Sequence, residues 1–228
     1  AYTQTVRAFN LAERFMTPVF LLLDETLGHM QAKAVLPEIS DLKIEHRAEF
    51  KGSPKDYEPY DAAPDKPAVL NPFFRGYHYH ITGLHHGAKG FPTENEQIVD
   101  RSIKRLFNKI SAHEDEIVQY EEFMLDDADA CIIAYGSVSL AAKDAILKLR
   151  GQGVRVGLFR PITLWPSPVR KLRELGERFN KILIAELNLG QYLLEVQRAC
   201  LRDDFKTLLK ANGRPISPSE IIEKVKEL

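Results

Sequence analysis

The chain has 228 residues, of which 44% are hydrophobic, and its 31 basic and 32 acidic side chains leave a formal net charge of -1. A chain of this size can bury a sizeable core in one large domain, or in one and a half smaller ones. Its balanced charge argues against general binding to nucleic acid or to an anionic membrane. Two cysteines exclude a disulfide framework and cannot supply the four thiolates of an iron–sulfur cluster.

No charged-then-apolar signal segment opens the sequence, so we expect a cytoplasmic protein. Residues 18–23 are apolar but far fewer than the ~20 residues that span a bilayer. A helix is predicted before them from apolar residues at helical spacing, namely Val6, Phe9, Ala12 and Phe15. It is expected to end near Met16, because Pro18 follows. Residues 19–23 then predict a buried strand. We expect residues 1–33 to be the end of a larger α/β domain, the rest of which is missing or supplied by other chains.

Residues 34–92 are rich in proline, show little periodicity and predict a long crossing between domains. A helix is predicted after it, with Thr93 as N-cap and Glu96 completing a capping box, running to about Ile110 or Glu116. From residue 129 onward, three apolar strands each lead into a turn and then a helical pattern. These strands cover residues 130–135, 154–159 and 181–185. The fold class is therefore α/β with a parallel sheet, and functional residues are expected where the strands end.

Four of the seven histidines cluster within residues 77–86, which raises the question of a metal site. The spacing argues against it, because His85 and His86 would point to opposite faces and no carboxylate stands at ligand spacing. A polar loop at an interface is the favoured interpretation.

The turn after the first strand holds Gly136 and Ser137, at the start of a helix. Its amides could bind a phosphate, a carboxylate or coenzyme A, but an ordinary turn is the favoured interpretation. Arg160 ends the second strand as an anion clamp or an interface residue.

Trp165 stands in a proline-flanked loop that suits docking against another subunit. Glu186, Asn188 and Gln191 end the third strand and are expected at an interface, and Glu186 could also pair with Arg160. Glu25 and His29 are candidates for the rim of an active site. Spacing alone identifies no nucleophile and base.

Several of these segments occur together, and in the same order, in a known family. They are residues 8–13, 17–20, 24–30, 82–84, 89–94, 135–137, 160–166, 186–191 and 213–217. On these segments the chain resembles the C-terminal part of the α subunit of 2-oxoacid:ferredoxin oxidoreductases, especially the 2-oxoglutarate type. The resemblance covers essentially the whole chain.

The resemblance implies that residues 1–33 end a thiamine-pyrimidine-binding domain and that residues 93–228 form a domain like the transketolase C-terminal domain. It implies an enzyme complex that uses thiamine diphosphate, Mg²⁺, a [4Fe–4S] cluster and coenzyme A, and that reduces ferredoxin. The cofactors would lie on a β subunit and on the missing N-terminal region, with an α–α contact besides. This chain would hold no metal and no catalytic residue, and would be inactive alone.

One position departs from the family, which usually has Glu-His after Thr-Gly-Leu, where this chain has His85-His86. Two other interpretations stay open. The chain could be a stand-alone interaction or scaffold module derived from such a subunit. It could also be a piece of a related thiamine-dependent dehydrogenase or transketolase.

Overall fold

The computed structural model describes residues 1–31 and 33–228, without the side chains of residues 26 and 27. The chain forms two compact units. The first comprises residues 1–22 and 33–117, and the second residues 23–31 and 118–228. Among the described residues, no helix has the length and apolar character needed to cross a membrane.

The first unit is built around two helices, α1 (Tyr2–Phe15) and α3 (Glu96–Ser111), followed by the short α4 (Glu114–Ile117). The predicted end of α1 is confirmed, since Met16 adopts a left-handed conformation with φ 46°. The ammonium group of Lys109 on α3 donates to the carbonyl oxygens of Phe15 and Met16, at 2.9 and 3.2 Å. A cation at a helix C-terminus satisfies carbonyls that lack helical partners, so this contact joins the two helices.

Between these helices the chain is largely irregular, with two 3₁₀ turns, η1 (Ile39–Asp41) and η2 (Pro54–Asp56). An aromatic cluster around buried Tyr57 organises this segment, and the Tyr57 hydroxyl donates to the carbonyl of Val69 at 2.8 Å. Asn71 is also buried and exchanges hydrogen bonds with the backbone of Phe50. These side chain-to-backbone bonds add to the scattered backbone hydrogen bonds of this segment, such as that from the amide of Tyr60 to the carbonyl of Ala88.

Two sequence predictions in this region are wrong. Residues 19–23 form no strand, and their side chains are exposed, Phe20 to 83%. An extended segment without a neighbouring strand has no partner for its backbone groups. The N-cap of α3 is Asn95, whose side chain accepts from the amide of Ile98 at 3.1 Å, while the Thr93 hydroxyl accepts from the amide of Asn95.

The burial of α3 is the reverse of its hydrophobic pattern. Arg105 and Lys109 are buried, whereas the apolar side chains of Ile103, Leu106 and Phe107 are 41%, 51% and 67% exposed. Large exposed apolar groups on one helix are typical of surfaces that another chain or domain covers.

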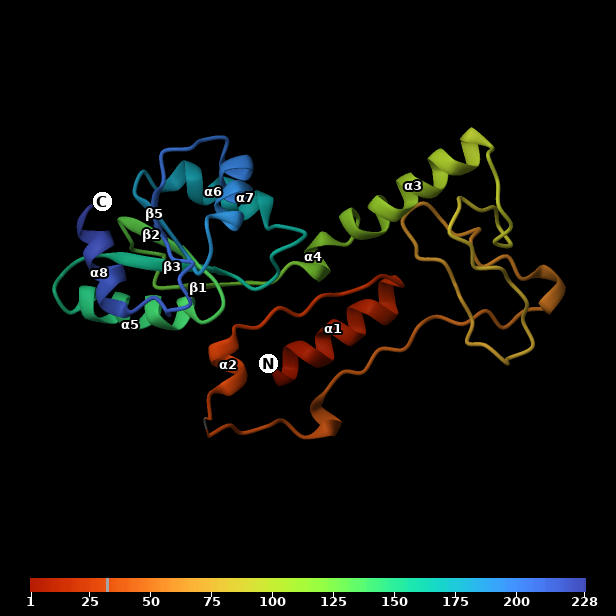
Figure 1. Ribbon diagram of the computed structural model, residues 1–228, viewed down its shortest axis with the longest axis horizontal. Coiled ribbons are helices and arrows are strands. Elements are labelled where there is room, and N and C mark those ends of the chain that lie inside the picture. The colour runs from red at the N-terminus through yellow and green to blue at the C-terminus, as the bar shows by residue number, and fades with distance from the viewer. Residues whose placement is uncertain (32) are drawn as a thin grey trace. The chain divides into compact units, whose positions relative to one another are not determined.

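The second unit contains a five-stranded sheet in the order β1-β3-β2-β4-β5 (Figure 1). Its strands are β1 (Tyr120–Phe123), β2 (Ala130–Ala134), β3 (Val156–Pro161), β4 (Ile182–Glu186) and β5 (Lys206–Leu209). Strands β2 to β5 pair in parallel, and β1 pairs antiparallel with β3. The predicted α/β class with a mostly parallel sheet is confirmed.

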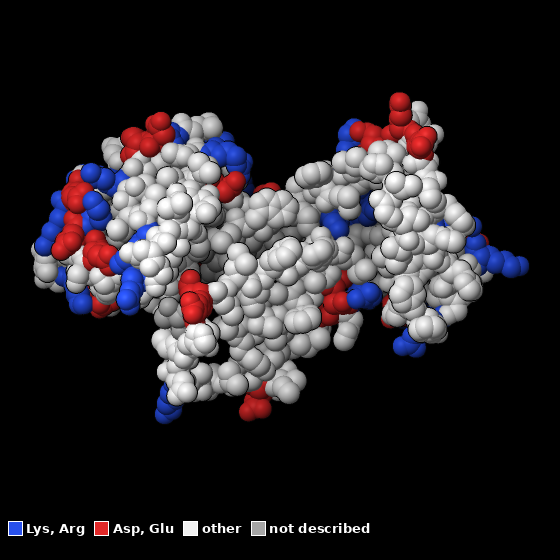
Figure 2. Space-filling view, in the orientation of Figure 1, with Lys and Arg blue, Asp and Glu red and all other residues white. Residues whose placement is uncertain are grey.

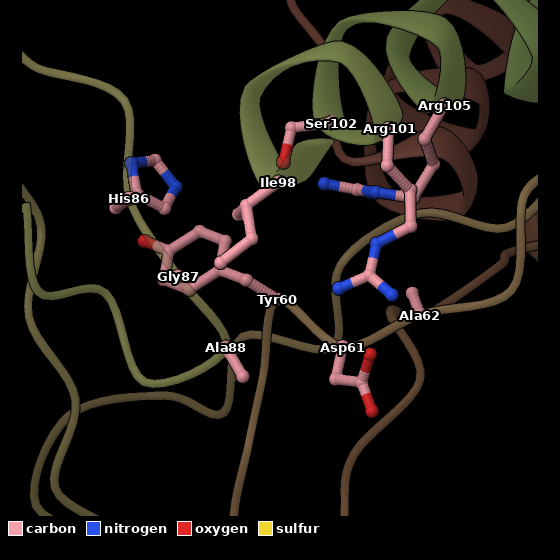
Figure 3. A pocket seen from close by; sticks show the side chains of 10 residues that line it. All are labelled: Tyr60, Asp61, Ala62, His86, Gly87, Ala88, Ile98, Arg101, Ser102 and Arg105. Carbon is pink, nitrogen blue, oxygen red and sulfur yellow. The ribbon is translucent and has the colours of Figure 1, made fainter. Parts of the chain in front are cut away.

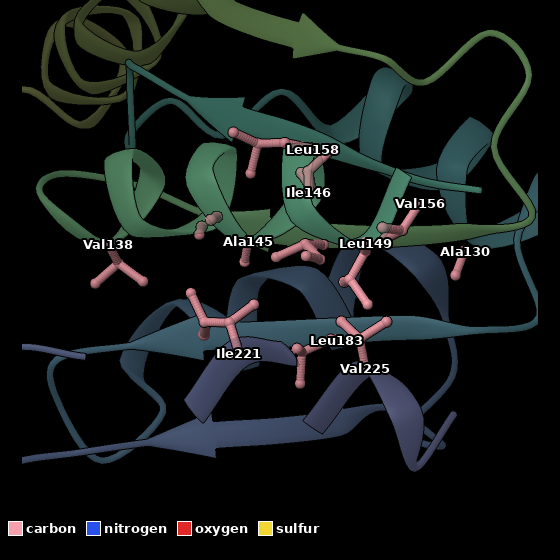
Figure 4. Close-up of a cluster of buried hydrophobic side chains, with 14 of the residues drawn as sticks. Ala130, Val138, Ala145, Ile146, Leu149, Val156, Leu158, Leu183, Ile221 and Val225 are labelled. Atoms are coloured by element: carbon pink, nitrogen blue, oxygen red, sulfur yellow. The ribbon is translucent and has the colours of Figure 1, made fainter. Parts of the chain in front are cut away.

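Helices cover both faces of this sheet, so β2 and β4 are buried throughout. One face packs against α5 (Val138–Arg150) and α8 (Pro218–Lys226), and the other against α6 (Val169–Arg178) and α7 (Gln191–Cys200). Figure 4 shows side chains of this first core, among them Leu149 of α5 opposite Val225 of α8. Neighbours along β2 alternate between the two cores, as strand geometry requires.

The surface of the second unit is mixed in charge. Figure 2 shows positive and negative side chains interspersed over it. Several form exposed ion pairs, for example Arg155 with Asp129 at 2.7 Å and Lys148 with Asp144 at 2.7 Å. Such pairs contribute little to stability individually.

Candidate functional site

The carboxyl ends of the neighbouring strands β2 and β4 carry a small polar network. The hydroxyl of Tyr135, just after β2, donates to a carboxylate oxygen of Glu186 at 2.9 Å. The same hydroxyl accepts a hydrogen bond from the side-chain amide of Asn188 at 2.8 Å. Parallel pairing of β2 with β4 brings these three residues together, because both strands end at the same edge.

Glu186 is 1% exposed, and its carboxylate is fully used within the chain. Besides Tyr135, it accepts from the amides of Tyr192 and Leu193, at 3.0 and 2.8 Å. These amides belong to the first turn of α7, where the helix dipole favours a negative charge. Glu186 thus stabilises the start of α7.

Two tyrosines at this edge are held in their protonated form. Burial and the nearby Glu186 carboxylate raise the pKa of Tyr135, and burial raises that of Tyr192. The ring centroids are 5.4 Å apart. The hydroxyl of Tyr192 is buried near Ser167 and meets no partner at hydrogen-bond geometry among the described residues. Neither phenol suits proton transfer near neutral pH, so the network positions backbone and side chains.

The amide of Ser137, at the start of α5, already has an anionic partner in the chain. Asp24, which precedes α2 (Glu25–His29), accepts from this amide at 2.7 Å. Gly136 has φ +58°, and an added Cβ would lie 3.0 Å from the Asp24 carboxylate. We predicted that Gly136 and Ser137 could bind an anionic ligand, but the Asp24 carboxylate occupies that position at the Ser137 amide.

Arg160 does not pair with Glu186, because β2 lies between β3 and β4 in the sheet. It faces Glu121 on the antiparallel strand β1 and donates to that carboxylate at 3.1 Å. Lys143 also donates a hydrogen bond to Glu121. The hydrogen bonds from Lys143 and, to a smaller extent, from Arg160 lower the pKa of the Glu121 carboxyl group. The Nε atom of Arg160 is buried without a partner in the part of the chain that the structure describes.

The other predicted interface and rim residues are exposed. Trp165 is 70% exposed in the loop after β3, and Leu189 is 79% exposed in the loop after β4. The Gln191 side chain accepts from the amide of Leu189 at 3.2 Å. Glu25 and His29 face solvent on α2, with side chains 92% and 82% exposed. The Nε2 atom of His29 lies 3.9 Å from the Oε1 atom of Glu25.

The histidine-rich segment gathers no metal-binding cluster among residues 1–31 and 33–228. His86 lies against the ring of Tyr60, and His80 lies against Phe91, with centroids 4.1 and 4.0 Å apart. Of the cysteines, Cys131 lies in the core with its pKa raised to about 12 by burial.

Sequence reasoning missed Tyr135, Tyr192 and the hydrogen bond between Asp24 and the amide of Ser137. A tyrosine directly after an apolar strand was the available signal, because its hydroxyl needs a partner when the ring is buried. The position of Asp24 gave no comparable signal, since its contact with Ser137 spans 113 residues.

The fold and its polar strand ends define an open α/β protein with helices on both faces of a mostly parallel sheet. Known proteins narrow this class. The family model for pyruvate:ferredoxin oxidoreductase core domain II matches residues 128–221. The model described as pyruvate flavodoxin/ferredoxin oxidoreductase, thiamine-diphosphate-binding, matches residues 1–105.

Individual relatives agree. The chain is 38% identical over 223 residues to the 2-oxoglutarate synthase subunit KorA of Methanothermobacter marburgensis, covering 97% of this chain and 59% of the relative. It is 30% identical to the ketoisovalerate oxidoreductase subunit VorB of the same organism, covering 98% of this chain and 56% of the relative. The chain thus spans little more than half the length of these relatives.

A solved structure of a 2-oxoglutarate:ferredoxin oxidoreductase from Magnetococcus marinus, with 2-oxoglutarate, coenzyme A and succinyl-CoA bound, superposes with a TM-score of 0.86. The two sequences are 26% identical, and the superposition covers 99% of this chain and 40% of the solved chain. The chain belongs to the 2-oxoacid:ferredoxin oxidoreductase family.

Proposed function

We propose that this chain is part of the α-type subunit of a thiamine diphosphate-dependent 2-oxoglutarate:ferredoxin oxidoreductase. The complete complex would convert 2-oxoglutarate and coenzyme A to succinyl-CoA and CO₂, with two electrons passed to ferredoxin. The observation that carries the proposal is the 38% identity to a 2-oxoglutarate synthase subunit across 97% of the chain.

The contribution of this chain would be packing and the rim of the active site rather than the redox centre. The exposed apolar side chains of residues 19–23 and of α3 support this role, because a subunit covers such groups in its assembly. Glu25 and His29 are proposed for the rim, and their exposure leaves both free to meet another chain or a substrate.

The cofactors would be held outside this chain. In the described residues, no group of three or more His, Cys, Asp or Glu is arranged to hold a metal ion. The buried Cys131 thiol, with its raised pKa, is a poor iron ligand, so these residues do not fit a [4Fe–4S] cluster. When bound, thiamine diphosphate supplies the decarboxylation of the 2-oxoacid and the cluster takes the electrons. We therefore propose that these groups and Mg²⁺ belong to the β subunit and the remaining α region.

Contacts between subunits are proposed at the strand ends of the second unit. Trp165 is the best anchor, because a large exposed aromatic side chain contributes strongly once an interface buries it. The buried Glu186 and the half-buried Asn188 would act through the loop that they hold, and the exposed Gln191 through its own side chain. We further propose an α–α contact, a β subunit and ferredoxin as partners, and a cytoplasmic location.

The test is ferredoxin reduction by the protein purified from its native source with its associated subunits. We expect reduction that requires both 2-oxoglutarate and coenzyme A, and that is faster than with pyruvate or 2-oxoisovalerate. A faster rate with 2-oxoisovalerate would assign the complex to another 2-oxoacid. Isolation of the chain without a thiamine-binding, iron-containing partner would leave only a scaffold role.

A further inference from the structure

A pocket in the first unit brings the positive side of α3 against two loops (Figure 3). Ile98, Arg101, Ser102 and Arg105 recur at helical spacing and therefore share one side of α3. Figure 3 shows these side chains extending from the helix toward Tyr60–Ala62 and His86–Ala88. The space between them opens to solvent, and its enclosed volume is about 20 Å³.

The loop side of this pocket is held by backbone hydrogen bonds. The amide of Tyr60 donates to the carbonyl of Ala88 at 3.0 Å, and the amide of Gly87 donates to the carbonyl of Phe91 at 2.9 Å. His86 forms a β-bridge with Pro92, and its ring packs edge-on against Tyr60. The wall is therefore formed before any ligand arrives, which lowers the entropic cost of binding.

The positive charge of the pocket is not balanced within the described residues. Arg105 is 7% exposed, and its guanidinium donates to the carbonyl of Lys66 at 3.3 Å. Burial lowers the pKa of Arg105, which reflects the cost of keeping the charge away from water. Neither Arg101 nor Arg105 forms an ion pair with a described carboxylate, including Asp61, which lines the same pocket. Two guanidinium groups and one carboxylate thus line the pocket, and no ion pair between described residues joins them.

We infer that this pocket binds an oxyanion, the phosphoryl or carboxylate group of a small ligand. Arg101 and Arg105 would supply forked donors, which match the geometry of both groups, and the Ser102 hydroxyl adds a neutral donor. A bound anion would compensate the charge of Arg105, which the fold leaves without a carboxylate partner. The inference does not rest on the proposed enzymatic function.

The test is a titration of the complete 228-residue protein, followed by the NMR signals of the arginine side chains at constant ionic strength. Inorganic phosphate and succinate are the two probes. We expect saturable shifts of Arg101 and Arg105, and roughly tenfold weaker binding of the better probe by R101Q, about 1.4 kcal/mol. Arg101 is exposed, so this substitution spares the core. R105K keeps the charge but loses the fork, and should also weaken binding.

The matched control is K104Q on the same helix. Lys104 is exposed, pairs with Asp100 at 2.8 Å and does not line the pocket, so K104Q removes an equal charge elsewhere. It should change binding less than twofold. Tighter binding of phosphate would identify a phosphoryl ligand, and tighter binding of succinate a carboxylate ligand. Non-saturable shifts with both probes, or equal weakening by R101Q and K104Q, would overturn the inference.

Discussion

Tyr135 and Glu186 lie 51 residues apart in the sequence and share a hydrogen bond of 2.9 Å at the ends of adjacent parallel strands. Asn188 completes the arrangement by donating to the same hydroxyl. Because Glu186 also accepts from the first turn of α7, one carboxylate links the end of β2 to the start of a helix. The loop after β4, which carries Asn188, is therefore held at both of its ends.

The first prediction compares half-buried Tyr135 with buried Tyr192 at this edge. Tyr135→Phe removes a hydroxyl that bonds to both Glu186 and Asn188, and should lower the free energy of unfolding by about 1–2 kcal/mol. Tyr192→Phe removes a hydroxyl that has no described partner and should cost less than about 0.5 kcal/mol. Urea denaturation of both variants measures the difference. Equal losses would show that the Tyr135 bonds contribute nothing specific.

The second prediction concerns the anchor of the segment that contains α2. Asp24→Ala should expose the amide of Ser137 to exchange, because its carboxylate partner at 2.7 Å is lost. We expect hydrogen exchange at Ser137 to become roughly tenfold faster, corresponding to about 1.4 kcal/mol. The control is Glu25→Ala, which removes a neighbouring carboxylate that is 92% exposed. Unchanged exchange in Asp24→Ala would contradict the anchoring role.

The third prediction is a pH dependence of stability at the start of α8. Lys210, followed by the amide and hydroxyl of Ser217, lowers the pKa of Glu220 to about 2 from its ordinary value of 4.5. A lowered pKa in the folded state stabilises the fold fully above the unfolded value, and this contribution is lost as the pH falls from about 4.5 toward 2. The side chain is 36% exposed, so solvent screening keeps the effect modest.

Glu220→Gln should therefore reduce stability at pH 7 and approach the unmodified protein as the pH falls toward 2. Thermal unfolding across this range measures the convergence. Glu223→Gln, at an exposed position of the same helix, removes the same charge outside the capping box. A stability difference that stayed constant with pH would exclude the linkage to Glu220.

The fourth prediction tests the Trp165 loop. Trp165→Ala should weaken subunit association while leaving the fold nearly unchanged, because the ring is 70% exposed in this chain. A central aromatic anchor typically contributes about 2 kcal/mol or more to an interface. Sedimentation velocity of the purified complex measures association, and Leu147→Ala, an exposed apolar position on α5, is the control. Assembly of Trp165→Ala with unchanged affinity would count against the interface.

The sequence by itself determined the three central strands of the second unit, but it did not predict the two edge strands β1 and β5. The apolar runs near residues 130–135 and 181–185 became β2 and β4, because a strand covered by helices on both faces must be apolar throughout. The pattern of α1 and its end near Met16 were equally readable, since helical spacing and a following proline act over a few residues.

The tertiary structure alone decided which strand ends became neighbours and which segments found partners. Arg160 pairs with Glu121 rather than Glu186, because the strand order is set by packing across the whole sheet. The apolar residues 19–23 form no strand, since a strand needs the backbone groups of another strand, which local sequence does not supply. The charged pocket beside α3 likewise depends on residues 60–62, which lie about 40 residues earlier in the chain, a separation at which sequence patterns carry no geometric information.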